Sequence, residues 1–156
     1  MTSLKYDDIF SSFLGDVTDY NIVNLSITDA TELMQEYLHK ALSETYVRRL
    51  FSSVELADDV QTMIFEMKRV GDEIADKEFV THMLGKWMTY EWIHNQVRSV
   101  LNTSQFFGGA EQKWFAQANH LSQLKELQEQ IYSEARNFIR DKGYIENSYL
   151  EGGITS

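Results

Sequence analysis

Two glutamate–histidine pairs are the residues of this chain whose types and spacing could do chemistry. Glu36 and His39 form the first Glu-x-x-His pair, and Glu91 and His94 form the second. Two pairs of this kind, pointing into a helix bundle, supply ligands to carboxylate-bridged di-iron sites. A di-metal oxidase is therefore one hypothesis, and the direction in which each pair faces tests it.

Helical periodicity separates the two pairs. When residues 76–102 are wound as a helix at about 100° per residue, apolar side chains recur on one face, and the second pair falls within this stripe. The first pair lies opposite the apolar face of its own helix, which centres on Tyr37, and so faces water. The stripe on residues 76–102 contains Phe79, Val80, Met83, Leu84, Trp87, Tyr90, His94, Val97 and Leu101. Because only one pair points inward, we expect no metal site and no cofactor.

Glu91 and His94 are instead expected to form a buried structural polar pair. An unpaired charge in a protein core costs several kcal/mol, so these side chains must bond to each other, to Arg98 or Arg48, or to a backbone group. The chain has no cysteine, no Gly-x-Ser-x-Gly motif, no phosphate-binding loop and no dinucleotide-binding motif. The sequence offers no catalytic residues, and we predict that the protein is not an enzyme.

The composition is that of a single globular domain with an acidic surface. The 156 residues are 43% hydrophobic and 13% aromatic, and none is proline. No run approaches the roughly 18 apolar residues of a membrane helix, and the first residues lack the apolar segment of a secretion signal. The formal net charge of -10 argues against binding to phosphate backbones. An acidic surface serves solubility, and it also suits a protein that lies near DNA without adhering to it.

The helical patterns predict an all-α fold. Three long helices and a short N-terminal helix form a small bundle, and an extended C-terminal arm follows. Gly15 and Gly143 are expected to end the first and last helices, and Asp29 is expected to cap the second. The predicted helices are residues 3–14, 29–51, 76–102 and 119–142.

The other segments lack a helical pattern. Residues 52–76 are expected to form short helical turns or a loop. A strand at residues 62–67 is the alternative, although no hairpin partner is evident nearby. The domain organisation is then a helical bundle over residues 1–143 and an extended arm over residues 144–156.

Three segments are candidates for protein contacts. The last long helix carries apolar residues from Leu121 to Phe138 at alternating spacings of three and four, so it can serve its own core and a neighbouring subunit at once. The aromatic side chains of a loop at residues 103–117 either cover the bundle or contact a partner. The arm is expected to bind a partner, with a disordered tail as the alternative. The predicted partner-binding residues are Phe106, Phe107, Trp114, Phe115, Tyr144, Ile145, Tyr149, Leu150 and Ile154.

Three short groups of aromatic and acidic residues resemble small structural proteins of tailed bacteriophages. The first is Lys-Tyr-Asp-Asp-Ile-Phe at residues 5–10, continued by Phe-Leu at 13–14 and Thr-Asp-Tyr at 18–20. The others are Met-Thr-Tyr-Glu-Trp at 88–92 and Phe-Ala-Gln-Ala-Asn-His-Leu at 115–121. The likeness is to head-tail connector proteins, also called neck adaptors.

This resemblance implies a helical adaptor that assembles with copies of itself into a ring of roughly twelve subunits below the portal. DNA would pass through the bore without specific binding. The portal protein and the next neck or tail protein would be the partners, with no role for a membrane. The expected location is the head-tail junction of the virion, after synthesis in the cytoplasm of the bacterial host.

Two other functions stay open at this point. One is a tail-completion protein or another neck protein of the phage. The other belongs to a different class, a helical regulator that binds one protein partner through the aromatic loop.

Overall fold

The computed structural model describes the backbone of residues 1–17, 26–104 and 111–145, and the side chains of these residues except 27, 100–104, 111–118 and 143–145. Within this part of the chain the elements follow in the order β1, α1, α3, α4, β2, β3, α5 and α6. The strands form one three-stranded antiparallel sheet in the order β1-β3-β2. The fold is therefore α+β, and the prediction of an all-α protein is wrong.

A β-hairpin replaces the irregular segment that the sequence predicts. β2 (Phe51–Ala57) and β3 (Thr62–Met67) pair as antiparallel neighbours. β3 shows the period of two expected of a half-buried strand, because Met63 and Phe65 are fully buried and the residue between them is exposed. The alternative prediction, a strand at residues 62–67, has the same bounds as β3. The prediction of turns or a loop over residues 52–76 is wrong, since β2 supplies the hairpin partner.

β1 (Thr2–Lys5) completes the sheet from the start of the chain. It pairs with the other edge of β3, opposite residues 62–65. α1 follows directly and spans Tyr6–Asp16, so the first predicted helix began too early. Gly15 lies inside α1, and no glycine of the described residues has a positive φ, so the expected glycine stop is wrong.

The second predicted helix is two helices. α3 (Ile27–Ser43) follows Ser26, whose hydroxyl oxygen accepts a hydrogen bond at 3.1 Å from the backbone N–H of Asp29. Ser26 is therefore the N-cap, and the predicted cap at Asp29 is wrong. The backbone is extended at Glu44, with ψ at 132°, and the short helix α4 (Thr45–Arg48) follows.

Two long helices form the second half of the molecule. α5 (Glu73–Ser104) confirms the helix predicted for residues 76–102 and extends it at both ends. α6 (Glu111–Ile145) starts earlier than predicted and continues through Gly143, which is not a stop. The segment predicted as an aromatic loop is therefore helical at both ends, and the predicted arm is helical over its first two residues.

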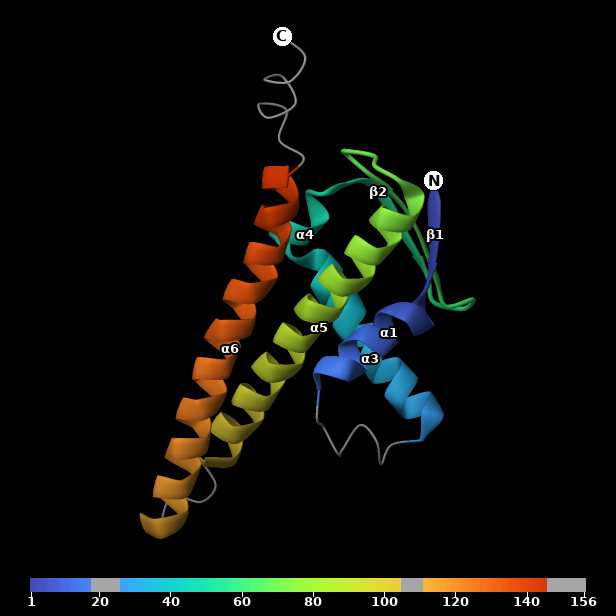
Figure 1. The fold of residues 1–156 in the computed structure, drawn as a ribbon. Helices are drawn as coiled ribbons and strands as arrows, with labels where there is room; N and C mark the ends of the chain where they lie inside the picture. Colours follow the sequence, from blue (N-terminus) through green and yellow to red (C-terminus); the bar gives the residue numbers. More distant parts are fainter. Residues whose placement is uncertain (18–25, 105–110, 146–156) are drawn as a thin grey trace.

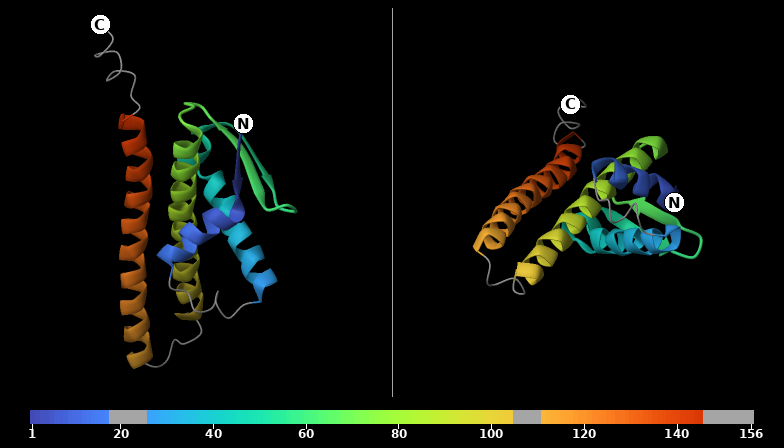
Figure 2. Two further views of the ribbon diagram at one scale, coloured as in Figure 1. Left: turned by 45° about the vertical axis from the view of Figure 1, so that its right-hand side comes forward. Right: turned by 90° about the horizontal axis from the view of Figure 1, so that it is seen from below.

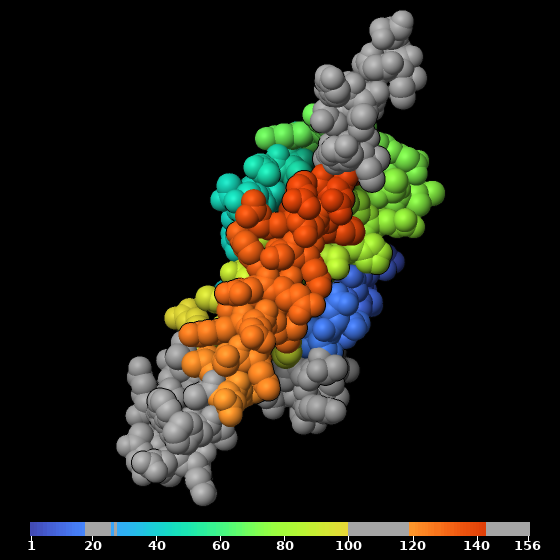
Figure 3. Space-filling view, turned by 60° about the vertical axis from the view of Figure 1, so that its left-hand side comes forward, coloured from blue at the N-terminus to red at the C-terminus, as the bar shows by residue number. Residues whose placement is uncertain are grey.

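α5 lies at the centre of the molecule. α1, α3 and the sheet lie on one side of it, and α6 lies on the other side (Figures 1 and 2). Figure 3 shows α6 crossing one face of the molecule with its outer side toward solvent. Among the side chains of α6 that the structure describes, only Ala135 and Ile139 are buried. Most of the core therefore comes from the other elements, and α6 covers α5 from outside and adds Ala135 and Ile139 to the core.

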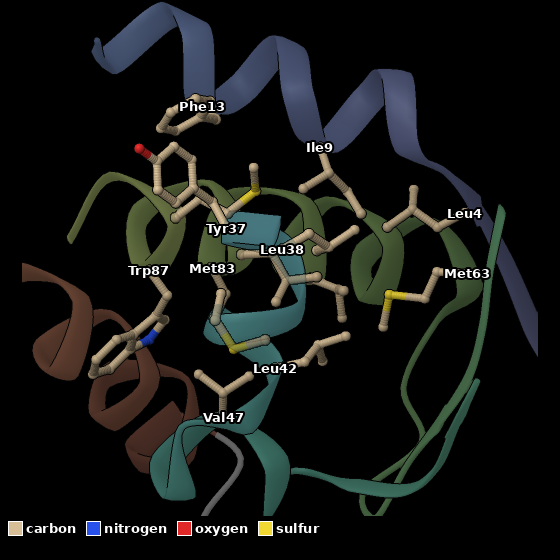
Figure 4. Close-up of a cluster of buried hydrophobic side chains, with 14 of the residues drawn as sticks. Leu4, Ile9, Phe13, Tyr37, Leu38, Leu42, Val47, Met63, Met83 and Trp87 are labelled. Atoms are coloured by element: carbon tan, nitrogen blue, oxygen red, sulfur yellow. The ribbon is translucent and has the colours of Figure 1, made fainter. Parts of the chain in front are cut away.

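The main core joins α5 to the first half of the chain (Figure 4). Met83 and Trp87 of α5 are fully buried, and Trp87 has the largest of the fully buried side chains. Burying side chains of this size supplies most of the favourable free energy of folding. The other labelled members come from both helices and strands: Leu4, Ile9, Phe13, Tyr37, Leu38, Leu42, Val47 and Met63.

The close approach of α1 to α5 generates the first prediction. A Cβ atom placed on Gly85 of α5 would lie 2.6 Å from the Ser12 side-chain oxygen and 3.3 Å from the backbone nitrogen of Phe13. Gly85→Ala should therefore push α1 away and lower the free energy of unfolding by about 1–3 kcal/mol, despite the better helix propensity of alanine. Urea unfolding measures this change.

The matched control is Gly15→Ala. Gly15 also lies in a helix, but a Cβ atom there would meet nothing within 4 Å. This substitution should leave stability unchanged or raise it by up to about 1 kcal/mol. Equal effects of the two substitutions would contradict the close approach of the helices.

Candidate functional site

Glu91 lies where α5 faces the break between α3 and α4. Its carboxyl group is half-buried and hydrogen-bonds to that of Glu44, the residue at the break. Burial raises the pKa of Glu91 to about 7, and the hydrogen bond and negative charge of Glu44 act in the same direction, while Lys40 opposes them. With its pKa near 7, the Glu91 carboxyl group is partly protonated at neutral pH. The prediction that Glu91 is satisfied by His94 or an arginine is replaced by this pairing.

His94 lies one turn further along α5 and has a different partner. The side-chain amide of Gln128 in α6 donates a hydrogen bond to its Nδ1 atom at 3.0 Å. The imidazole also stacks on the ring of Tyr90, with centroids 6.2 Å apart. His94 and Glu91 are both half-buried and have different partners, so the predicted buried pair of these two side chains does not form.

The first Glu-x-x-His pair faces solvent as its periodicity predicts. Glu36 forms a 2.9 Å ion pair with Lys40 on the surface of α3, and the exposed His39 bonds to Asp58. The two pairs are thus not brought together. In residues 1–17, 26–104 and 111–145, no group of three or more histidine, aspartate or glutamate side chains is placed to hold a metal ion.

A second polar cluster lies at the turn between β2 and β3, and the sequence did not reveal it. The hydroxyl of the fully buried Tyr6 donates a 2.5 Å hydrogen bond to one oxygen of Asp58, and Nε2 of His39 lies 2.8 Å from the other. The hydrogen bond from Tyr6 lowers the pKa of Asp58, and burial raises the pKa of Tyr6. At neutral pH the carboxylate is therefore charged and the phenol neutral. The cluster ties the hairpin turn to α1 and α3.

Asp76 is the most deeply buried acid of the described residues. Its carboxylate accepts a hydrogen bond at 3.1 Å from the backbone N–H of Gly71, and Nζ of Lys142 lies 3.7 Å away. The same ammonium group lies 4.4 Å from the centre of the Phe79 ring, which stacks on Phe138 of α6. The end of α6 is thereby attached to the start of α5.

Aromatic and cationic side chains also join α4, α5 and α6. The Tyr132 ring of α6 lies edge-on to Trp87 at 5.7 Å. Arg136 lies over the Tyr46 ring of α4 at 4.3 Å, and Arg49 lies over the same ring at 5.0 Å. These contacts hold the helices together. None of them places a nucleophilic side chain beside a general base.

The predicted partner-binding residues lie outside the described side chains. Trp114, Phe115, Tyr144 and Ile145 belong to the α6 backbone, but their side chains are not described. The other five, Phe106, Phe107, Tyr149, Leu150 and Ile154, lie outside the described residues altogether. Their role in contacts therefore stays a prediction.

The Glu44–Glu91 pair predicts an unusual dependence of stability on pH. The pKa of Glu91 is about 7 in the folded chain against an ordinary value of 4.5, so the folded state binds more protons between these values. The contribution of Glu91 to the free energy of unfolding must then fall as the pH rises from about 4.5 to 7. Glu91→Gln should remove this fall in the free energy of unfolding. The variant should then be more stable than the parent chain at pH 8, by about 1 kcal/mol after allowing for solvent screening.

Denaturant unfolding at several pH values measures this effect. Glu78→Gln is the control, because Glu78 is an exposed residue of the same helix. It should keep the pH dependence of the parent chain. A Glu91→Gln curve parallel to that of the parent would show that the two carboxyl groups do not interact.

The link between Asp76 and Lys142 predicts a large effect of a single substitution. Lys142→Met keeps an aliphatic side chain over Phe79 but leaves the buried carboxylate without its cation. The free energy of unfolding should fall by about 2 kcal/mol, and adding Asp76→Asn should recover part of the loss. Lys125→Met on the exposed face of α6 should change stability little.

No protein-family model, curated protein or solved structure matches the chain. Among the described residues, no helix has both the length and the apolar character needed to cross a membrane. The polar clusters link secondary-structure elements, and the surfaces of these elements are the basis for a functional proposal.

Proposed function

We propose that this protein is a structural subunit of the neck of a tailed bacteriophage. Copies of the chain form a ring below the portal, DNA passes through the bore, and the ring joins the capsid to the tail. The resemblance of residues 5–20, 88–92 and 115–121 to head-tail connector proteins supports the proposal. The protein would be made in the host cytoplasm and be located at the head-tail junction of the virion.

The long outer helix α6 is the observation that carries this proposal. Its 35 residues extend for about 50 Å at about 1.5 Å per residue. α6 packs on the molecule through one face, mainly against α5 and, near Tyr46, against α4. The opposite face of the described part is solvent-exposed along its length (Figure 3). A rigid helix exposed in this way provides a lateral surface for a neighbouring subunit.

The chemistry of this face fits a contact between copies. The outer face carries the cation Arg140 and the anions Glu126 and Glu129, and Leu127, which is 39% exposed, lies at one edge of it. A ring needs a head-to-tail interface, in which this face meets a different surface of the next copy. A charged face bordered by an exposed apolar residue is typical of interfaces between subunits that are also stable alone.

The acidic charge of the chain supports the passage of DNA. With a net charge of -10, the surface repels phosphate groups, and no cluster of cations is present in the sequence that would hold a DNA strand. DNA can then move through a ring of such subunits without binding to it.

Assembly tests the proposal. Native mass spectrometry and electron microscopy of the purified protein should detect closed rings, alone or after addition of the portal protein. Antibodies should locate the chain at the neck of phage particles. A stable monomer that is also absent from particles would contradict the proposal and favour a regulator that binds a single partner.

Leu127→Glu tests the part played by α6. The substitution places a charge at the exposed apolar residue of the proposed interface and should lower the fraction of assembled protein about tenfold, with helicity and thermal unfolding unchanged. Leu14→Glu is the matched control, since Leu14 is 42% exposed on α1, away from α6. If both variants assemble like the parent, the ring contact lies elsewhere.

A further inference from the structure

A group of arginines lies where α4 meets the C-terminal half of α6. The guanidinium group of Arg136 lies 4.3 Å from the centre of the Tyr46 ring, and that of Arg49 lies 5.0 Å from the same centre. Arg140 follows Arg136 by one turn of α6, so the two are neighbours on the helix surface. All three arginines are exposed, and Figure 3 shows this half of α6 on an open face of the molecule. These three residues form the arginine site.

The charge of the arginine site is not balanced within the described part of the chain. None of the ion pairs between described side chains includes a member of the site. The nearby carboxyl group of Glu44 bonds to that of Glu91 instead. Glu134 and Asp141 of α6 point at least about 100° around the helix away from both of its arginines. Like charges one turn apart destabilise a helix, so the site favours an anion from outside the chain.

Carboxylates gather at another place, where the β2–β3 turn meets the start of α1. The turn contains Asp58 and Asp59, and the first turn of α1 contains Asp7 and Asp8. Tyr6 joins the two turns, because its hydroxyl donates to Asp58 and its backbone N–H donates a 2.9 Å hydrogen bond to the end of the hairpin turn. All four aspartates are exposed, and they form the aspartate cluster.

The aspartate cluster keeps a net negative charge. Two cations border it, since His39 bonds to Asp58 and Lys5 precedes α1. Even with both of them charged, four carboxylates exceed two cations. The cluster therefore offers anions of the kind that the arginine site lacks.

The arginine site and the aspartate cluster lie on opposite sides of the molecule. α6 is at one side and the β2–β3 turn is at the other in every ribbon view (Figures 1 and 2). A single chain therefore cannot bring its own arginines to its own aspartates. Two copies related by a rotation can do so, and the same contact then repeats from each copy to the next.

We propose that the arginine site of each copy binds the aspartate cluster of the next copy. This inference rests on the proposed ring and names the surface that the α6 side of each subunit meets. A ring requires two different surfaces that match head to tail, and these two match in charge. Guanidinium groups bind carboxylates through paired hydrogen bonds, and the Tyr46 ring holds two of the guanidinium groups in place.

The overall charge of the chain favours a second copy over a nucleic acid at this site. With a net charge of -10, copies repel one another, so a contact between them needs cations that face anions. Three arginines neutralise too few phosphates to hold a DNA strand against the same negative charge. The aspartate cluster, in contrast, is present once in every copy, as a repeating contact requires.

Charge reversal tests this contact. Arg49→Glu combined with Arg140→Glu makes the arginine site acidic, and Asp8→Lys combined with Asp59→Lys reverses the aspartate cluster. Each double variant alone should lower the fraction of assembled protein at least about tenfold in native mass spectrometry. All four side chains are exposed, so helicity and thermal unfolding should stay near those of the parent chain. Should a double variant fail to fold, Arg140→Glu and Asp59→Lys alone take its place, since neither removes a hydrogen bond between described residues.

Mixing the two double variants gives the sharper result. Each variant keeps one native surface, and the two reversed surfaces are again opposite in charge. An equimolar mixture should therefore recover assembly, with the two variants alternating, and a tag on one variant identifies both by mass. If the arginines bind DNA or another acidic protein instead, the mixture would stay unassembled, and this result would overturn the inference.

Arg98→Glu combined with Lys125→Glu is the matched control. This variant changes the net charge by the same amount as the arginine variant, at exposed residues of α5 and α6. Lys125 lies about 16 Å along α6 from Arg136, outside the arginine site. The control should assemble like the parent chain. An equal loss of assembly in the control would show that net charge, and not the arginine site, governs the contact.

The outcomes separate this inference from the proposed function. If both double variants form rings as readily as the parent chain, the inference is overturned and the ring stays. If mixing restores assembly but only dimers or open chains form, the ring is overturned and the contact between copies stays. A parent chain that remains monomeric even with the portal protein present would overturn both.

Discussion

Burial of α5 on both sides is the constraint on which the rest of the structure depends. Met83 and Trp87 are fully buried, Trp87 also meets Tyr132 of α6, and Gly85 lets α1 approach closely. The opposite side of α5 is covered by α6, which has few fully buried side chains of its own. The first half of the chain therefore forms a compact body with α5, and α6 is an outer layer on that body.

Polar side chains link these layers at the places where elements meet. Glu91 meets Glu44 at the break before α4, Asp76 meets Lys142 at the end of α6, and Asp58 receives two hydrogen bonds at the hairpin turn. Among the side chains that the structure describes, each buried or half-buried carboxyl group has a partner from a distant part of the chain, because an unpaired one would cost several kcal/mol. The charged groups of this protein thus specify how elements join, and its function is expected at exposed surfaces.

The outer face of α6 has properties that a subunit of an assembly needs, because it is long and mixed in charge. The Asp76–Lys142 link attaches the end of α6 to the start of α5. Loss of this link is therefore expected to disturb the position of α6 as well as the stability of the chain.

The sequence by itself determined the helices that have strong local patterns and the direction in which their polar residues face. The period of 3.6 residues located α5, placed Glu36 and His39 in water and placed His94 toward the interior. Only the tertiary structure decided the sheet and the polar partners. β3 pairs with β1 from the start of the chain, and Glu91 pairs with Glu44, because such contacts depend on which distant segments the core brings together. Local periodicity carries no information about that choice. For the same reason the prediction that Gly15 and Gly143 end their helices is wrong, since both helices continue past these glycines.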